Sequence, residues 1–564
     1  MNKFILTGAT VLLGVSAYAQ SAVDAYRLSQ PDLKGTARYM SMGGAFGALG
    51  GDLSSISHNP AGIGVYRNSD IGFTLDLDLQ NSESTSNIGS SAVNQTKFLL
   101  NNAGIVWTLK LPSASVPNLN FGFTYNKNVS FNRRYRGQIR LNNSLSNFIA
   151  TNSTLSGYQP DMLVDDYNSD YDPYSPDAGN IDWLSILGYN GFLFSNNYAS
   201  PNQPDYVGLW GGDTTGTGWF DVVESGGIDS YNIAIGGNIA NVVFWGMDFD
   251  ITHMNYNLTP IWEENLQNAI VGNDNGDFAL KPAYFNLQNF YNCSGTGFNY
   301  KLGIIVKPIQ ELRLGFAFET PTWYTLTESF RANLYSDFYN ADDDTYDVYE
   351  RTTNGGWTGY NDVNFRTPWK INASAAAVLF NKLILSGEYE WTKYKGMKYS
   401  TPTYWGDDYY GYDYPPYDPY YDPYISYDAF AQTNSEIKEY YRNTNTLRLG
   451  AEFRVTSQLS VRAGYSLVSS PVETKTKNSE VVTVGTIPNY RLDNTTNYIT
   501  CGLGYKIQNF SIDLAYVYKH ITSEYNAFSP IYEDINSGPL IVEPQKASLS
   551  FNNSQIVLSA GFKF

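Results

Sequence analysis

The amino-acid sequence predicts an all-β protein, an antiparallel transmembrane β-barrel of about fourteen strands with an N-terminal hatch in its lumen. Three observations favour this fold class. Segments of alternating apolar and polar residues recur from residue 70 to the end of the chain, as in strands with two different faces. The gaps between these segments alternate between short and long, as in an even-stranded membrane barrel. A segment rich in small residues precedes all of them.

The first nineteen residues have the composition of a secretory signal peptide. Lys3 supplies a positive charge, residues 4–15 are apolar, and Ala17-Tyr18-Ala19 forms an A-x-A cleavage motif. We therefore expect residues 1–19 to be removed and the mature chain to start at Gln20. Export of a barrel-like chain predicts the outer membrane of a Gram-negative cell. A soluble secreted β-protein is the alternative.

Residues 20–67 form the predicted hatch. Their small-residue part is too rich in glycine for a stable helix and too poor in β-branched residues for a strand. Such a segment buries little apolar area alone, so we expect it to be packed inside something larger. Asn59-Pro60-Ala61 and several aliphatic and aromatic residues argue against the alternative of a flexible linker. Five glycines would permit close backbone packing: Gly43, Gly44, Gly47, Gly50 and Gly51.

Residues 68–564 form the predicted barrel with long extracellular loops. The first strands are expected at residues 70–80, 97–111 and 118–134, and the last at residues 555–564. A polar, tyrosine-rich insert of about ninety residues follows the third strand, with short helices expected at 144–151 and 181–187. It is too long for a plain connection.

The connections between the predicted strands are of two kinds. Six are turns of a few residues, at 111–118, 240–242, 307–310, 380–382, 456–458 and 507–509. Seven are long and polar, at 81–96, 135–227, 259–293, 336–364, 399–442, 470–494 and 525–551. Tight turns toward the periplasm and long loops toward the outside are typical of an outer-membrane barrel, and a β-sandwich would not sort its connections this way.

The strand faces also indicate a membrane protein. Leu449 lies on an apolar phase whose other side carries Arg448 and Glu452, and Ile512 and Leu514 share a phase that leaves Asp513 on the other. Charged residues on the inward phase require a wet lumen or internal pairing. Barrel closure would pair every backbone group within the lipid.

Charge and composition exclude some partners. The 36 basic and 54 acidic residues give a net charge of −18, which argues against nucleic acid as a partner. The two cysteines, Cys293 and Cys501, are expected to be unpaired. No mature run of about eighteen apolar residues is present, which excludes helical membrane spans.

The order of these segments resembles the FadL/TodX family of outer-membrane transporters of hydrophobic compounds. The similarity lies in the compact segment ending in Asn59-Pro60-Ala61 and in the hairpin from Leu447 through Tyr465 to Val472. Residues 386–392, SGEYEWT, are similar to the family's ninth strand. The insert after the third strand and the Tyr-Asp-Pro loop match no family pattern.

This resemblance implies passive transport of hydrophobic small molecules such as long-chain fatty acids or aromatic hydrocarbons. The hatch would gate passage through the glycines given above and Asn59, Pro60 and Ala61, and the ligand could leave sideways into the bilayer. Phe564 resembles the signal read by the barrel assembly machinery, and outer-membrane lipid would be the other partner. The alternative is a structural or adhesive surface barrel whose hatch is a permanent plug.

The chain offers little catalytic chemistry, and we expect no enzyme, no cofactor and no metal site. His58, preceded closely by serines, is expected to be a hydrogen-bonded hatch residue rather than part of a nucleophilic site. No His/Cys cluster has zinc spacing. The carboxylates of residues 407–428 and of Asp342, Asp343 and Asp344 lack EF-hand spacing, so an exposed loop is favoured over a Ca²⁺ site.

Overall fold

A computed structural model describes residues 21–166, 170–175, 178–179, 181–197, 204–272, 278–340, 344–402, 429–478, 481, 485–532 and 540–564. Three predicted features lie outside these ranges: the signal peptide together with Gln20, the pair Asp342 and Asp343, and the Tyr-Asp-Pro loop at 407–428.

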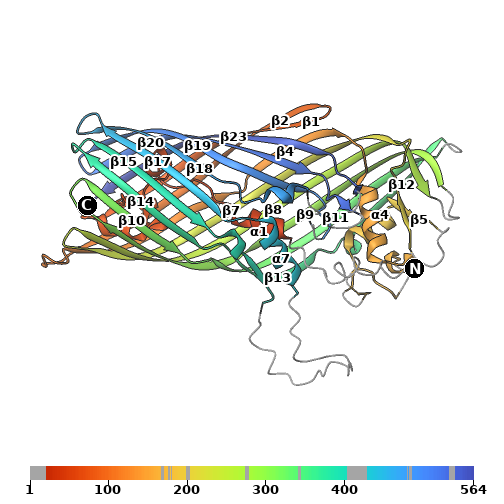
Figure 1. The fold of residues 1–564 in the computed structure, drawn as a ribbon, viewed down its shortest axis with the longest axis horizontal. Helices are drawn as coiled ribbons and strands as arrows, with labels where there is room; N and C mark the ends of the chain where they lie inside the picture. The colour runs from red at the N-terminus through yellow and green to blue at the C-terminus, as the bar shows by residue number, and fades with distance from the viewer. Residues whose placement is uncertain are drawn as a thin grey trace, which may run out of the picture.

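The wall is a closed antiparallel barrel of fourteen strands, as the alternation predicts (Figure 1). Pairing of the last wall strand with the first closes it. In order around the ring, the wall strands are β1 Asp70–Ser86, β2 Gly89–Lys110, β3 Asn118–Ser130, β7 Thr215–Ile239, β8 Val243–Gly272, β9 Phe278–Val306, β10 Leu312–Glu319, β14 Lys370–Leu379, β15 Leu383–Thr392, β17 Thr444–Arg454, β18 Leu459–Val468, β19 Tyr490–Ile507, β20 Phe510–Asn526 and β23 Lys546–Lys563.

Four wall strands are interrupted part-way along. The third bends at Phe131 and Asn132 and continues as β4 Arg133–Arg140, and both parts pair with β7. The strand of β10 resumes as β11 Trp323–Asn340, and the neighbouring strand consists of β13 Gly359–Arg366 followed by β14. Prolines interrupt both, at Pro321 and Pro368, because proline removes a ladder hydrogen bond. β16 Lys398–Ser400 follows β15 and pairs with β13, and β12 Thr345–Thr352 pairs with β11.

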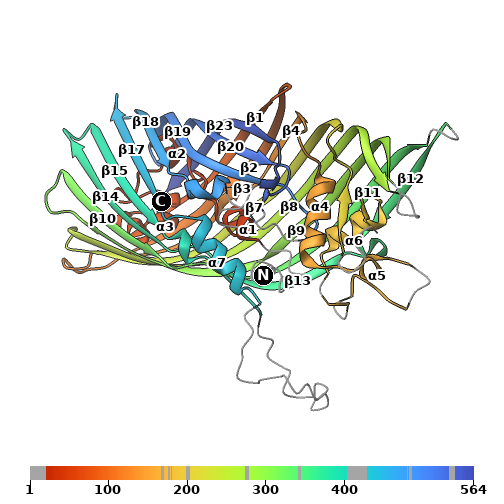
Figure 2. The ribbon, with the colours of Figure 1, turned by 45° about the vertical axis from the view of Figure 1, so that its right-hand side comes forward.

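The helices form an inner group and an outer group. Inside the barrel are α1 Ala22–Ser29, α2 Ala37–Ser41, α3 Leu53–His58 and the 3-10 helix η2 Pro60–Val65. The insert after the third strand gathers at the end opposite the C-terminus (Figure 2). It contains α4 Leu145–Ser156, α5 Pro160–Leu163, α6 Trp183–Asn190, β5 Phe194–Asn196 and β6 Tyr206–Gly208. The remaining elements are η4 Thr353–Gly356, η5 Tyr394–Gly396, α7 Ala431–Tyr440, η6 Thr474–Asn478, β21 Ile531–Tyr532 and β22 Leu540–Val542.

None of the helices in the described ranges is long and apolar enough to cross a membrane.

Two predicted long loops are strands in the structure. β1 and β2 pair as far as Ser86 and Gly89 with one register shift, between Thr74 and Leu75, and β8 and β9 pair as far as Gly272 and Phe278 with a register shift between Leu266 and Ala269. The end of the β1–β2 hairpin carries polar residues on both faces, so the alternation that marks lipid-facing strands is absent although the backbone ladder continues. The end of the β8–β9 hairpin keeps apolar residues such as Trp262 and Leu266 on its buried face. At the short-turn end, Ala240 and Asn241 both have positive φ, as do Phe380 and Asn381, which fits tight hairpin turns.

The two faces of the wall differ as the sequence phase predicts. Leu449, Ile512 and Leu514 are each 45–54% exposed on the outside of the barrel. Asp513 on the opposite phase contacts Arg462 of β18, two strands away around the ring, at 2.6 Å. The outward apolar face and the internally paired charges together fit a wall that stands in lipid.

The outward position of Leu449 gives a direct test of the membrane phase. Leu449 lies about six residues from the short turn, or roughly 15 Å along the barrel axis, near the bilayer midplane. Leu449→Arg should therefore cost about 2–4 kcal/mol in a reversible folding assay in lipid vesicles, whereas Val455→Arg at the turn should cost about 0–1 kcal/mol. Equal costs at the two positions would contradict the assigned phase and depth.

Candidate functional site: the lumen and its hatch

Residues 21–66, the hatch, fold as a chain of short helices inside the barrel because each helix has its own N-terminal cap. The Thr36 hydroxyl accepts from the Tyr39 amide at 3.2 Å, and the Asp52 carboxylate accepts from the Ser54 amide at 2.9 Å. Ser21 and Asp24 form a capping box at the start of α1. These caps satisfy orphan helix donors, so short helices persist in a segment whose glycines prevent a long one.

The predicted hatch glycines serve the turns between α2 and α3. Gly43, Gly44, Gly50 and Gly51 all have φ between +62° and +78°, a region that favours glycine. Gly47 lacks this conformation, but its amide donates to the Glu388 carboxylate of β15 at 2.8 Å. The predicted site residues are therefore brought together as one tightly folded loop. Their part in gating is a proposal, taken up below.

Six wall glycines, which we call the glycine collar, contact the hatch and were not predicted. A Cβ atom at any of them would overlap atoms of hatch residues 41–61. The collar comprises Gly246 of β8, Gly303 of β9, Gly315 of β10, Gly450 of β17, Gly464 of β18 and Gly502 of β19. Glycines on the inward phase of a strand often mark close backbone approach, and this signal was available in the sequence.

The tripeptide Asn59-Pro60-Ala61 seats the end of the hatch on this collar. The Asn59 side chain caps η2 by accepting from the Ala61 amide at 3.1 Å, and it donates to the Gly47 carbonyl at 2.5 Å. Pro60 is the first residue of η2, where its missing N–H costs nothing. All three residues are buried. Because Asn59 also bonds Gly47, the tripeptide holds the folded loop of residues 43–51 against the wall.

Three ion pairs and one histidine–carboxylate hydrogen bond, which we call the hatch latches, connect the hatch to four wall strands. They are Lys34 to Asp76 of β1 at 2.7 Å, Asp32 to Lys519 of β20 at 3.0 Å, Arg38 to Glu452 of β17 at 2.9 Å and His58 to Glu388 of β15 at 2.5 Å. Burial acts to raise the pKa of Asp32, but the charges of Lys519 and Lys34 outweigh it and hold the pKa below its usual range. Removing one partner of such a buried pair leaves an uncompensated charge, which is costly.

The latches differ in whether the wall residue would still have an oppositely charged partner if the hatch moved away. Glu388 also contacts Arg448 at 2.6 Å, and Glu452 also contacts Arg462 at 2.7 Å, so both carboxylates would keep a wall cation. Asp76 makes an ion pair only with Lys34 among the described residues. Lys519, the wall partner of Asp32, likewise makes no other ion pair among the described residues. Release of the Lys34 latch or of the Asp32 latch would therefore leave a wall charge unpaired.

His58, Glu388 and Glu390 form a cluster whose ligand atoms lie within 4.8 Å of one another. Arg448 lies against both carboxylates, at 2.6 Å from Glu388 and 3.0 Å from Glu390. A metal ion would have to displace this guanidinium. The cluster is therefore assigned to the hatch latch and not to a metal site.

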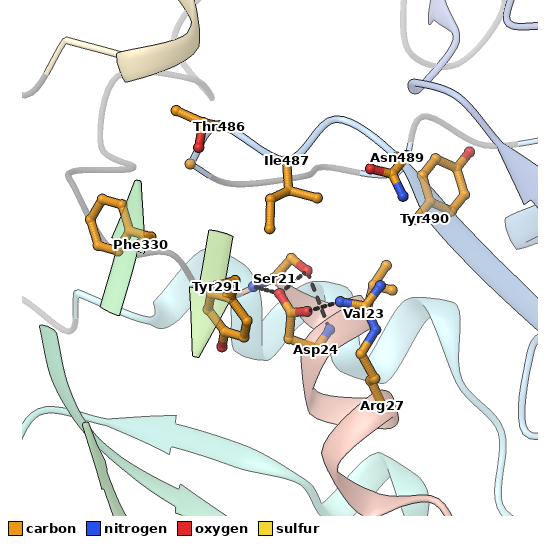
Figure 3. Close-up of a pocket in the computed structure, with 11 residues that line it drawn as sticks. Ser21, Val23, Asp24, Arg27, Tyr291, Phe330, Thr486, Ile487, Asn489 and Tyr490 are labelled. Carbon is orange, nitrogen blue, oxygen red and sulfur yellow. Dashed lines mark hydrogen bonds and ion pairs between the residues drawn. The ribbon is translucent and has the colours of Figure 1, made fainter. Parts of the chain in front are cut away.

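Two of the cavities that adjoin the hatch differ in size and lining, and the larger of these two is polar. It has a volume of about 170 Å³, and its lining includes Lys34, His58, Lys301, Lys370 and Arg448. The smaller, of about 20 Å³, lies at the start of α1, where Ser21, Asp24 and Arg27 approach side chains of two wall strands and of residues 485–490 (Figure 3). These wall side chains are Tyr291 of β9 and Phe330 of β11.

The lumen on the long-loop side of the hatch is filled largely by aromatic side chains. The ring of Tyr26 on α1 lies 5.9 Å from Tyr394 and 5.4 Å from Tyr441. The rings of Phe220 and Tyr525 stack at 4.1 Å. These residues belong to one large buried cluster. The lumen thus passes from a packed apolar region rich in aromatic residues, which we call the aromatic core, to a polar cavity beside the hatch.

The wall has an open strand edge between β2 and β3. β2 pairs with β3 only from Asn102 to Lys110, while its other edge pairs with β1 as far as Gly89. β4 instead lies behind the β1–β2 hairpin, where the Arg136 carbonyl accepts from the Ser84 hydroxyl. Residues 89–101 of β2 therefore have no ladder partner on the β3 side among the described strands. Asn101, fully buried at this edge, contacts the sulfur of hatch residue Met40 at 3.5 Å.

A closed wall with an apolar outer face and a hatch in its lumen defines an outer-membrane β-barrel with a plugged channel. The sequence profile of the outer-membrane transport protein family OMPP1/FadL/TodX matches residues 243–536, more than half of the chain. The chain belongs to this family. The family is one of transport proteins rather than enzymes, and its members are located in the outer membrane.

Solved structures with a similar fold have low sequence identity. A Pseudomonas aeruginosa FadL homologue is 12% identical with a TM-score of 0.49, over 95% of this chain and 99% of that one. The P. putida toluene transporter TodX is 11% identical with a TM-score of 0.46, over 94% and 99%. The Ralstonia pickettii toluene transporter TbuX is 13% identical with a TM-score of 0.44, over 96% and 100%. No curated protein matches the sequence.

The glycine collar gives a prediction with a matched control. A methyl group at Gly303 would overlap Asn59, so Gly303→Ala should dislodge the hatch from a barrel that still closes. Gly387 of β15 has only an ordinary contact, with Leu449 at 3.6 Å, so Gly387→Ala should leave the hatch in place. In planar bilayers, we expect higher ion conductance from Gly303→Ala only. Equal conductance of the two variants would show that the collar does not seat the hatch.

Proposed function

We propose that the protein passes hydrophobic small molecules across the outer membrane without energy input and that the hatch gates this passage. The observation that carries the proposal is the position of the hatch, which blocks the lumen next to the open β2 edge. Membership of a family of outer-membrane transport proteins supports transport as the activity. An edge that opens toward lipid suits a hydrophobic cargo, because a polar molecule would not enter the bilayer there.

The order of the aromatic core and the polar cavity along the lumen suggests the route of a hydrophobic cargo. A cargo first meets the aromatic core around Tyr26 and Tyr441, whose buried rings would have to part and would then offer apolar contacts to rings or acyl chains. The polar cavity beyond it, lined by Lys34 and Arg448, opposes a straight path for such a cargo. Rearrangement of the hatch near Met40 would instead open a sideways path at Asn101 of β2. Long-chain fatty acids and aromatic hydrocarbons both fit this chemistry.

A permanently plugged structural or adhesive barrel is the second candidate. It is favoured by the polar cavity and by the four buried latches, which hold the hatch on several sides. Two features favour transport instead. The wall cations Arg448 and Arg462 would keep Glu388 and Glu452 paired after hatch movement, and the β2 edge is open.

Removal of the hatch separates the two candidates. Deletion of residues 21–53, which keeps Asn59-Pro60-Ala61, should leave the barrel folded because its strands pair with one another around the ring. If the hatch gates passage, cells expressing this variant should differ from the parent in uptake of radiolabelled oleate and toluene and should also admit small polar solutes.

Heat-modifiable gel mobility serves as the folding control for this deletion. A folded deletion variant that takes up neither more nor less of each compound than the parent would contradict gating. It would leave the plugged surface barrel as the better interpretation.

A further inference from the structure

We propose that the outer wall carries a binding site for a membrane lipid with a phosphate headgroup. The site is a groove of about 650 Å³ across β9, β11, β13 and β16, which we call the basic groove. Its lining includes Phe298, Tyr300 and Trp323, which are 39–49% exposed on the outside of the barrel, and two basic residues, Arg366 and Lys398. It lies on other strands than the open edge between β2 and β3.

Strand register places the apolar and basic residues in one row across the wall. Phe298 pairs with Trp323, Trp323 pairs with Arg366, and Arg366 pairs with Lys398. The rings of Phe298 and Trp323 lie 5.5 Å apart. An aromatic surface thus adjoins two neighbouring cations on the same outer face.

The two cations lack a described acidic partner. Like charges directly opposite on neighbouring strands destabilise a sheet. The Arg366 guanidinium donates to the Gly396 carbonyl at 3.1 Å, and neither Arg366 nor Lys398 makes an ion pair with any residue in the described ranges. The chain as a whole has a net charge of −18, yet these two adjacent cations have no acidic partner within the described ranges. A bound anion between them would remove the repulsion.

The height of the groove matches the headgroups of the outer leaflet. Phe298 lies eight residues before Val306, the short-turn end of β9, which corresponds to roughly 20 Å along the barrel axis. The apolar band of such barrels is about 25 Å tall and ends in aromatic residues. Trp369 and Trp391 lie next to this level with ring centroids 4.9 Å apart. Cations at this boundary can meet lipid phosphates.

The wall below the groove would hold the acyl chains of the same lipid. Leu302 of β9 and Phe316 of β10 are 49% and 47% exposed on the outer face. An uncharged cargo would gain nothing from Arg366 and Lys398, and a free anion would gain nothing from the aromatic surface. A phosphate-bearing lipid uses both.

The test measures lipid retention by native mass spectrometry. Detergent-purified protein is incubated with phosphatidylglycerol or with phosphatidylcholine of the same chains. We expect the parent to prefer the anionic lipid by roughly tenfold or more, since two cations act on one phosphate. Arg366→Gln combined with Lys398→Gln should remove this preference. Lys307→Gln combined with Lys506→Gln, near the short turns at the other end of the barrel, should keep it.

Two results would overturn the proposal. One is an unchanged lipid preference in the Arg366 and Lys398 double variant, with folding verified by heat-modifiable mobility. The other is displacement of the lipid by millimolar inorganic phosphate, which would assign the groove to a free anion.

Discussion

Close contact between the hatch and the glycine collar is the constraint on which the rest of the structure depends. A barrel in lipid must pair all of its backbone groups, so its strands close into a ring. Fourteen strands enclose more space than their own side chains fill here, and the hatch occupies that space. It can do so only where the wall lacks Cβ atoms, as at Gly246, Gly303 and Gly464. The glycines of the wall and of the hatch are thus two halves of one interface.

The latches determine how this interface could open. Buried charges without partners are costly, so a hatch held only by ion pairs would be fixed in place. Arg448 and Arg462 already contact the wall carboxylates that pair with His58 and Arg38. Hatch movement would therefore leave Glu388 and Glu452 neutralised. Asp76 and Lys519 have no such substitute among the described residues, so their contacts with Lys34 and Asp32 restrain the hatch more strongly than the other two latches do.

The sequence predicted the wall well because lipid imposes a simple pattern on strands. Leu449, Ile512 and Leu514 face outward as the alternation requires. Alternation gave the wrong prediction beyond the membrane, where residues 81–96 were predicted to form a loop. These residues continue the β1–β2 hairpin, but they are polar on both faces and therefore do not alternate. The hatch residues were found from glycine content and from the motif at Asn59. The latches were not, because most of them join residues hundreds of positions apart, as Arg38 and Glu452 show. The collar was missed although glycines on the inward strand phase marked it.

A reversible cross-link between the hatch and the collar tests most directly whether the hatch must move. A Cβ at Gly450 would lie 2.9 Å from the Met42 Cβ, so a small shift would bring the Met42→Cys and Gly450→Cys pair into the disulfide range of about 3.5–4.5 Å. The account predicts that oxidation of this double variant stops toluene uptake and that dithiothreitol restores uptake to the level of Gly450→Cys alone, while neither Met42→Cys alone nor Gly450→Cys alone responds to oxidation or reduction. Uptake at the parent rate with the disulfide fully formed would contradict the account.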